Sequence, residues 1–126
     1  EIFKELELSR VEILGGNKFK GAKKNMSSYI NTKSSEIVNE KIQNQMPFAV
    51  NLWLKSVVGY QFEGSAQEIV DNFKKLFFPE GNKDLEENFI KNLSDQAAFE
   101  KESLKLLSQL NLLKEHSNDS MEESDE

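Results

Sequence analysis

The 126-residue sequence contains no cysteine and only one histidine. The absence of cysteine excludes disulfides, thiolate metal sites and cysteine nucleophiles from this chain. The histidine, His116, lies near the C-terminal end, and one imidazole cannot supply the several nitrogen ligands that Co²⁺ or Zn²⁺ sites usually use. We therefore assign His116 no role and expect no metal site in this chain.

Long apolar runs are also missing. No stretch approaches the roughly 18 apolar residues that a membrane-spanning helix needs, so we expect no contact with a membrane and a cytoplasmic location. The chain begins at Glu1, without Met and without a charged-then-apolar leader. We therefore expect it to be an excerpt of a longer polypeptide.

Catalytic motifs are absent as well. The sequence has no glycine-rich phosphate loop, no Ser-His-Asp or Cys-His set and no strand-to-helix turn that would present a nucleophile. Paired carboxylates such as Glu86-Glu87 fall on a solvent-facing side of a predicted helix. We expect no catalytic residue in this chain, which leaves binding as its activity.

Charge is distributed unevenly along the chain. The whole sequence carries −6, but residues 114–126 alone carry −5, which leaves −1 for the preceding 113 residues. In contrast, residues 17–35 contain five lysines and no acid: Lys18, Lys20, Lys23, Lys24 and Lys33. A basic segment and an acidic tail are therefore expected.

Apolar residues recur at the helical period through most of the sequence, which favours an all-α protein. We predict a compact bundle of about five to six helices over residues 1–113, followed by a disordered acidic tail over 114–126. The segment 57–62 is β-prone but too short to indicate a sheet. A helical pattern occurs over seven segments, 2–14, 22–30, 35–45, 47–59, 66–77, 85–93 and 95–113, and it is weakest over 35–45, where only Ile37, Val38 and Ile42 are large and apolar.

Boundary signals accompany these segments. Gly15-Gly16 is expected to end the first helix, and Pro47 is expected to open the fourth segment. Ser65 with Glu68, Asp84 with Glu87, and Ser94 are expected to cap the helices that follow them. The segment opened by Pro47 has apolar residues in almost every direction, so it should be the central helix, with Trp53 anchoring the core.

Several short motifs, read in order, resemble one family. They are the run Leu8-Ser9-Arg10-Val11-Glu12-Ile13-Leu14-Gly15-Gly16-Asn17-Lys18-Phe19-Lys20-Gly21, the apolar helix over 47–59, and Ser94-Asp95-Gln96-Ala97-Ala98-Phe99 followed by Leu106, Leu107 and Leu110. Together with the acidic stretch after them, they resemble the N-terminal region of the CobT subunit of aerobic cobaltochelatase, from about Leu6 to the end. The chain departs from the family pattern at Lys18-Phe19, where Arg-Met is usual, and over residues 31–45.

This resemblance implies a machine that uses ATP and Mg²⁺ to insert Co²⁺ into a corrin ring during cobalamin synthesis. CobT would be its adaptor subunit, oligomeric in an assembly with an AAA+ ATPase (CobS) and a large subunit that holds the macrocycle (CobN). In the family, an acidic linker leads to a von Willebrand A-type domain with a metal site. No Asp-x-Ser-x-Ser motif occurs here, so that metal site cannot be placed on this chain, and no cofactor is expected in it.

Candidate partner-binding residues are Arg10, Lys18, Phe19, Lys20, Lys23 and Lys24. Arg10 falls on the apolar face of its helix, where it could bind a partner's carboxylate or serve an internal structural role, with its head reaching water or Glu7. The lysines could form a solvated face, contact an acidic protein surface, or bind nucleic acid. The last would need more arginines, interleaved aromatics and a positive domain, so we expect no nucleic acid.

Two functions from different classes remain open. One is the adaptor region of an ATP-dependent cobalt chelatase that works through an AAA+ partner. The other is a stand-alone helical protein-interaction module unrelated to metal insertion. The acids of the tail are expected to form a solvated linker, because flexible carboxylates without rigid spacing make poor dedicated cation sites.

Overall fold

The structure, a computed structural model, describes the backbone of residues 2–18 and 20–124. Side chains are described for these residues except 17, 18, 20, 22, 23 and 112–124. The described residues form six helices and no strand, which confirms the all-α prediction. In chain order the helices are α1 (Ile2–Lys18), α2 (Lys20–Ile37), α3 (Ile42–Val57), α4 (Gly64–Phe77), α5 (Lys83–Lys91) and α6 (Gln96–Ser124).

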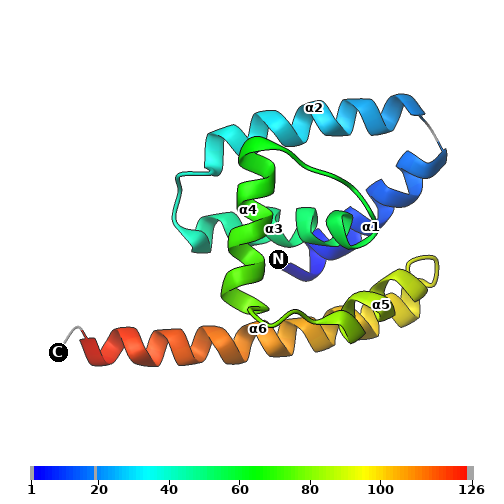
Figure 1. The fold of residues 1–126 in the computed structure, drawn as a ribbon. Coiled ribbons are helices and arrows are strands. Elements are labelled where there is room, and N and C mark those ends of the chain that lie inside the picture. Colours follow the sequence, from blue (N-terminus) through cyan, green and yellow to red (C-terminus); the bar gives the residue numbers. More distant parts are fainter. Residues whose placement is uncertain (1, 19, 125–126) are drawn as a thin grey trace.

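Helix α3 lies at the centre of the bundle, in contact with α1, α4 and α5 (Figure 1). Helix α2 packs on α1 and α4, while α6 lies along α5 and also contacts α1. None of the described helices combines the length and apolarity that crossing a membrane requires. The predicted boundary between a helical domain and an acidic tail at residue 113 falls where side chains lie outside the description, so it stays a prediction.

Trp53 anchors the core, as predicted, and its side chain is fully buried. Its ring centroid lies 5.6 Å from those of Phe78 and Phe89 and 6.0 Å from that of Phe73. Phe78, which follows α4, is thus packed on Trp53. Aromatic pairs in such tilted and edge-on arrangements add stabilisation beyond their buried area.

The predicted end of the first helix at Gly15-Gly16 is wrong. Gly15 and Gly16 lie inside α1, and neither has a positive φ; the glycines that do are Gly59, Gly64 and Gly81. A glycine in a helix interior costs only about 1 kcal/mol relative to alanine, so the tertiary packing of the helix overrides this cost. Packing is visible here because Gly16 is buried.

The segment predicted over 22–30 lies within α2, whereas the segment predicted over 35–45 spans the end of α2, a turn and the start of α3. In the polar stretch of α2, hydroxyls bond to carbonyls one turn back: Thr32 Oγ1 to Ser28 O and Ser35 Oγ to Asn31 O, both at 3.0 Å. Polar residues of this kind are therefore satisfied within the helix. Helix α2 ends at Ile37, not near residue 45.

Helix α3 begins at Ile42, so Pro47 lies beyond its first turn and not at its opening. The predicted cap at Ser65 is also wrong, because α4 begins at Gly64 with Glu63 as the N-cap residue and no side-chain bond. Asp84 likewise caps nothing: α5 starts after Asn82 without a side-chain cap. The cap of α6 is not Ser94 but the next residue.

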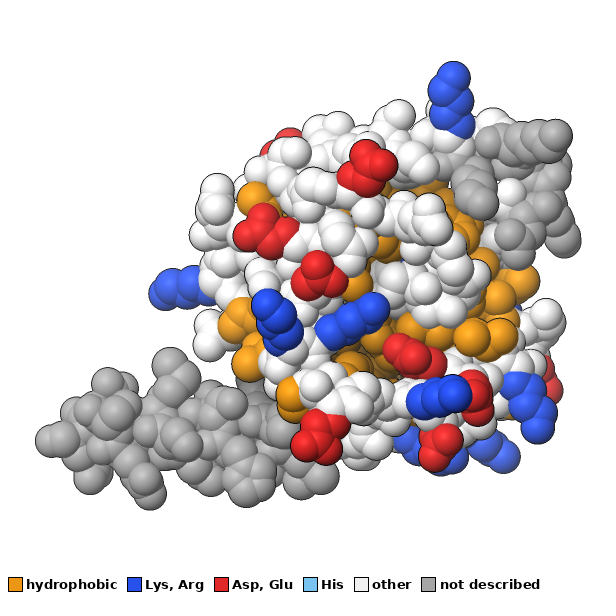
Figure 2. Space-filling model, in the orientation of Figure 1, with side chains coloured by type: hydrophobic (Ala, Val, Ile, Leu, Met, Phe, Trp, Pro, Cys, Tyr) orange, Lys and Arg blue, Asp and Glu red, His pale blue; other side chains and the backbone are white. Residues whose placement is uncertain are grey.

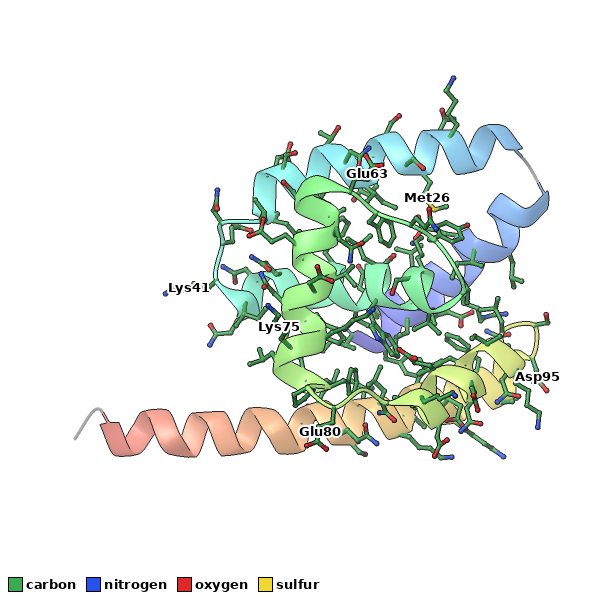
Figure 3. All side chains as sticks on the ribbon, viewed as in Figure 1. Met26, Lys41, Glu63, Lys75, Glu80 and Asp95 are labelled. Atoms are coloured by element: carbon green, nitrogen blue, oxygen red, sulfur yellow. The ribbon has the colours of Figure 1, made fainter. Side chains whose placement is uncertain are left out.

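That residue is Asp95, whose Oδ1 accepts a hydrogen bond from the backbone N–H of Ala98 at 3.1 Å. Asp95 lies in the turn between α5 and α6, at the edge of the bundle (Figure 3).

Across the face drawn in Figure 2, acidic and basic side chains are interspersed, with apolar side chains visible between them. Among the described side chains of that face, no extended surface carries a single sign of charge.

Candidate functional site

Arg10 is the predicted site residue that the structure explains most fully. Its Nε and Nη2 donate to Oε2 and Oε1 of Glu7 at 3.0 and 2.8 Å, and its Nη1 donates to the carbonyl of Leu93 at 3.2 Å. The guanidinium also lies 5.8 Å from the centroid of the Phe99 ring. Arg10 thus has the internal structural role that was one of its two interpretations.

Arg10 and Glu7 stabilise each other's charged forms. The hydrogen bonds from Arg10 lower the pKa of Glu7, and the same bonds raise the pKa of Arg10. Gln96 Nε2 adds a hydrogen bond to Glu7 Oε1 at 3.3 Å, so the pair joins α1 to the start of α6. A partner-binding role for Arg10 stays a prediction.

The predicted basic surface is only partly within the description. Lys24 is exposed on α2. Phe19 and the side chains of Lys18, Lys20 and Lys23 lie outside the described residues, so the structure does not show whether these groups share one face with Lys24.

A buried ammonium group is the main polar feature of the interior. Lys55 on α3 is 1% exposed, and its Nζ donates to Ser9 Oγ at 3.3 Å, to Glu12 Oε1 at 3.1 Å and to Asn51 Oδ1. An ammonium has three hydrogens, so these three acceptors use all of them. Lys55 is therefore a saturated donor fixed between α1 and α3.

Asn51 connects this ammonium to two carboxylates of α1. Its Nδ2 donates to Glu5 Oε2 at 2.9 Å and to Glu12 Oε1 at 3.3 Å. Its backbone carbonyl accepts a bond from Ser9 Oγ at 2.8 Å. We call Glu5, Ser9, Glu12, Asn51 and Lys55 the polar network; it crosses the interface between α1 and the central helix.

Burial and the neighbouring carboxylates shift the pKa of Lys55 in opposite directions. Removal from water lowers its pKa, while the carboxylates of Glu12 and Glu5 offset part of that decrease. The ion pair with Glu12 is asymmetric, since the side chain of Glu12 is 29% exposed and that of Lys55 is 1% exposed. Most of the desolvation therefore falls on the ammonium.

The polar network borders a cavity of about 360 Å³ between α1, α2 and α3. Glu5, Glu12, Asn51 and Lys55 contribute its polar lining on one side. Its other walls come from Tyr29, Ile30, Lys33, Ile37 and Glu40 of α2 and the following turn, from Asn44, Pro47 and Phe48 of α3, and from Leu8. This cavity is the candidate binding site.

Asn51 and Lys55 were not predicted as site residues from the sequence, although a signal for them exists. They are four residues apart on a helix whose apolar residues point in almost every direction. Polar residues on such a helix are buried with it, and those four apart lie on the same side. A buried polar pair must find partners, and here α1 supplies them.

The described residues include no group of three or more His, Cys, Asp or Glu placed to hold a metal ion. Glu5 and Glu12 are both hydrogen-bonded to Asn51, and no third such ligand joins them. We therefore assign no step of cobalt or magnesium chemistry to these residues.

These features define an all-helical protein in which a polar network around a saturated Lys55 ammonium borders a side-chain-sized cavity. The family model for cobalamin biosynthesis protein CobT matches residues 1–126, the whole chain. The chain belongs to the CobT family, as its motifs predicted, and membership implies involvement in the cobalt chelation of cobalamin biosynthesis. No curated protein and no solved structure matches the chain significantly.

Proposed function

We propose that this chain is a non-catalytic adaptor region of a CobT-like subunit, which acts in an ATP-dependent cobalt chelatase through an AAA+ ATPase. The observation that carries the proposal is the match of the CobT family model to all 126 residues. Co²⁺ and the corrin are then substrates held elsewhere in the assembly. Nucleotide and Mg²⁺ belong to the ATPase partner.

The geometry supports a binding role over a reactive one. Lys55, a buried amine that could otherwise serve as a nucleophile, has its three hydrogens committed to Ser9, Glu12 and Asn51. Arg10, the other buried cation among the side chains that the structure describes, is held by Glu7 and by the carbonyl of Leu93. In contrast, apolar side chains such as Leu8 and Val11 on α1 are about half exposed, as they often are where partners bind.

The test is reconstitution of the full-length protein with an AAA+ ATPase and a large chelatase subunit from the same genome. Cobalt insertion into the corrin, followed by its absorbance change, should require ATP and all three proteins. The same mixture with the present 126 residues deleted from the CobT-like subunit is expected to lose both complex formation and insertion.

Two results would overturn the proposal. One is insertion at an undiminished rate without these residues, and the other is failure of the full-length protein to associate with either subunit. The second result would favour a stand-alone interaction module.

A further inference from the structure

The cavity between α1, α2 and α3 is built from chemistry that recognises a cation. Its volume of about 360 Å³ is near the lower end of the roughly 300–1,000 Å³ range of ligand sites, so it suits one side chain and not a folded element. Three carboxylates, Glu5, Glu12 and Glu40, line it together with the rings of Tyr29 and Phe48. Carboxylates and aromatic faces both attract positive charge.

The hydrogen bonds within the polar network determine whether the cavity can bind an anion or a cation. The ammonium of Lys55 has no hydrogen left for an anion, because Ser9, Glu12 and Asn51 accept all three. Among the described residues, Glu5 Oε1 and Glu12 Oε2 accept no hydrogen bond; each carboxylate uses only its other oxygen. The groups beside the cavity that can still form hydrogen bonds are therefore acceptor oxygens of carboxylates.

The rings of Phe48 and Tyr29, which line the cavity, already contact a cation of this chain. Lys33 Nζ lies 5.5 Å from the centroid of the Phe48 ring and 5.9 Å from that of the Tyr29 ring. No carboxylate among the described residues forms an ion pair with it. The two rings are thus placed to accept a cation within the cavity, and Lys33 stands in for one.

We propose that this cavity binds an arginine side chain of a partner polypeptide. A guanidinium is flat enough to stack on an aromatic face and can direct N–H groups at carboxylate oxygens, and it is more weakly hydrated than an ammonium. Leu8 and Tyr29, each about half exposed, provide apolar surface beside the cavity for the rest of the partner segment. The arginine site does not depend on whether the partner is the ATPase.

The site can be probed by NMR titration of the 126-residue chain with Nα-acetyl-L-arginine amide. Nα-acetyl-L-citrulline amide is the matched probe, since it has nearly the same shape without the charge. We expect saturable shifts of backbone amides around Glu5–Glu12 and Tyr29–Lys33, with a millimolar dissociation constant, from the arginine probe alone. Equal shifts from both probes, or no saturable shift, would overturn the proposal.

Glu5→Gln tests the carboxylate with little risk to folding, because the amide oxygen of Gln can still accept the Asn51 hydrogen bond. We expect affinity for the arginine probe to fall about tenfold, the change that about 1.4 kcal/mol produces. Glu36→Gln is the control, because Glu36 is exposed on α2 and does not line the cavity. An equal loss in both variants would mean that only net charge matters and would overturn the site.

Lys33→Met separates this proposal from an anion site. If Lys33 competes with the incoming guanidinium, its removal should raise affinity for the arginine probe by about threefold or more, within the range of a cation–π contact. Lys24→Met removes the same charge from an exposed position on the same helix and should change affinity less. Loss of binding in the Lys33 variant would overturn the proposal.

Discussion

Arg10 and Leu93 connect α1 to the turn between α5 and α6: Arg10 Nη1 donates to the carbonyl of Leu93 at 3.2 Å, across 83 residues of sequence. That carbonyl lies just beyond α5, whose backbone groups there have no further helical partner. Since the same guanidinium binds both oxygens of Glu7, one side chain satisfies a carboxylate on α1 and a carbonyl in the turn after α5.

Arg10→Met should therefore lower the free energy of unfolding by about 1.5–3 kcal/mol, the usual range for hydrogen bonds to charged groups. Urea denaturation followed by circular dichroism would measure it. Glu7→Gln should cost less, under about 1 kcal/mol, because the Glu7 side chain is 33% exposed and water replaces part of the interaction. The reverse order of the two losses would contradict this account.

Lys55 predicts a pH dependence of stability. Its pKa in the folded protein lies below the ordinary value of 10.5, chiefly through burial. Between the folded pKa and 10.5 the unfolded chain binds more protons, so the free energy of unfolding should rise with pH in that window. Urea titrations from about pH 7 to about pH 10 should show the rise in the native chain and not in Lys55→Met.

Tyr60 acts in the opposite sense and must be separated from this effect. Burial raises its pKa above 10.0, which lowers stability as pH rises past that value. The effect of Tyr60 is present in both proteins and cancels in their difference. If the free energies of unfolding of the native chain and Lys55→Met change with pH in parallel, the ionisation of Lys55 does not affect stability, and the prediction is contradicted.

Gln45 caps the end of α2 from the first turns of α3. Its Nε2 donates to the carbonyls of Ile37, Val38 and Glu40 at 3.1, 2.9 and 2.8 Å. Gln45→Met should cost about 1–3 kcal/mol, because these partly buried carbonyls lose their donor. Gln45→Glu should cost more at neutral pH, since a carboxylate would face those carbonyls, and acid should recover part of the loss by protonating it.

The comparison needs a control for adding charge near the start of α3. Gln43→Glu serves, because Gln43 is exposed two residues earlier on the same helix. A negative charge there should be neutral or slightly stabilising, since it lies near the helix N-terminus. Equal destabilisation at both positions would indicate a general charge effect and not a lost cap. Thermal unfolding reports both.

Two glycines should respond to alanine in opposite directions. Gly15 has ordinary helical backbone, and a Cβ added there would meet nothing within 4 Å, so Gly15→Ala should stabilise by about 0.4–1 kcal/mol. Gly59 has the same open space but a φ of +105°, so Gly59→Ala should destabilise by about 1 kcal/mol or more through backbone strain alone. Denaturation midpoints that shift in the same direction would contradict this.

The sequence predicted the helical class, the central helix and Trp53 because these depend on apolar period, which is a local signal. It failed at Gly15 and at Ser65, where a residue type suggested a boundary that packing placed elsewhere. A capping residue and the same residue in a first turn have similar sequence surroundings. Only the position of the neighbouring helices decides between them.

The candidate site was harder to predict than the fold. Glu5 and Glu12 lie on α1, while Asn51 and Lys55 lie more than 38 residues later, and their hydrogen bonds exist only after α1 and α3 pack together. The helical pattern could have shown that Lys55 is buried. It could not have shown which acid meets it, nor that α2 leaves a cavity beside the pair.

The chain of ring contacts around Trp53 also makes the protein its own fluorescent reporter. Trp53 is the only tryptophan, and rings from α4, α5 and the segment after α4 all touch it. Phe89 extends the chain to Phe99 of α6, over which Arg10 lies. A shift in the emission maximum therefore registers loosening of α3, α4 or α5 at once, so one optical signal can follow assembly of the native bundle without a label.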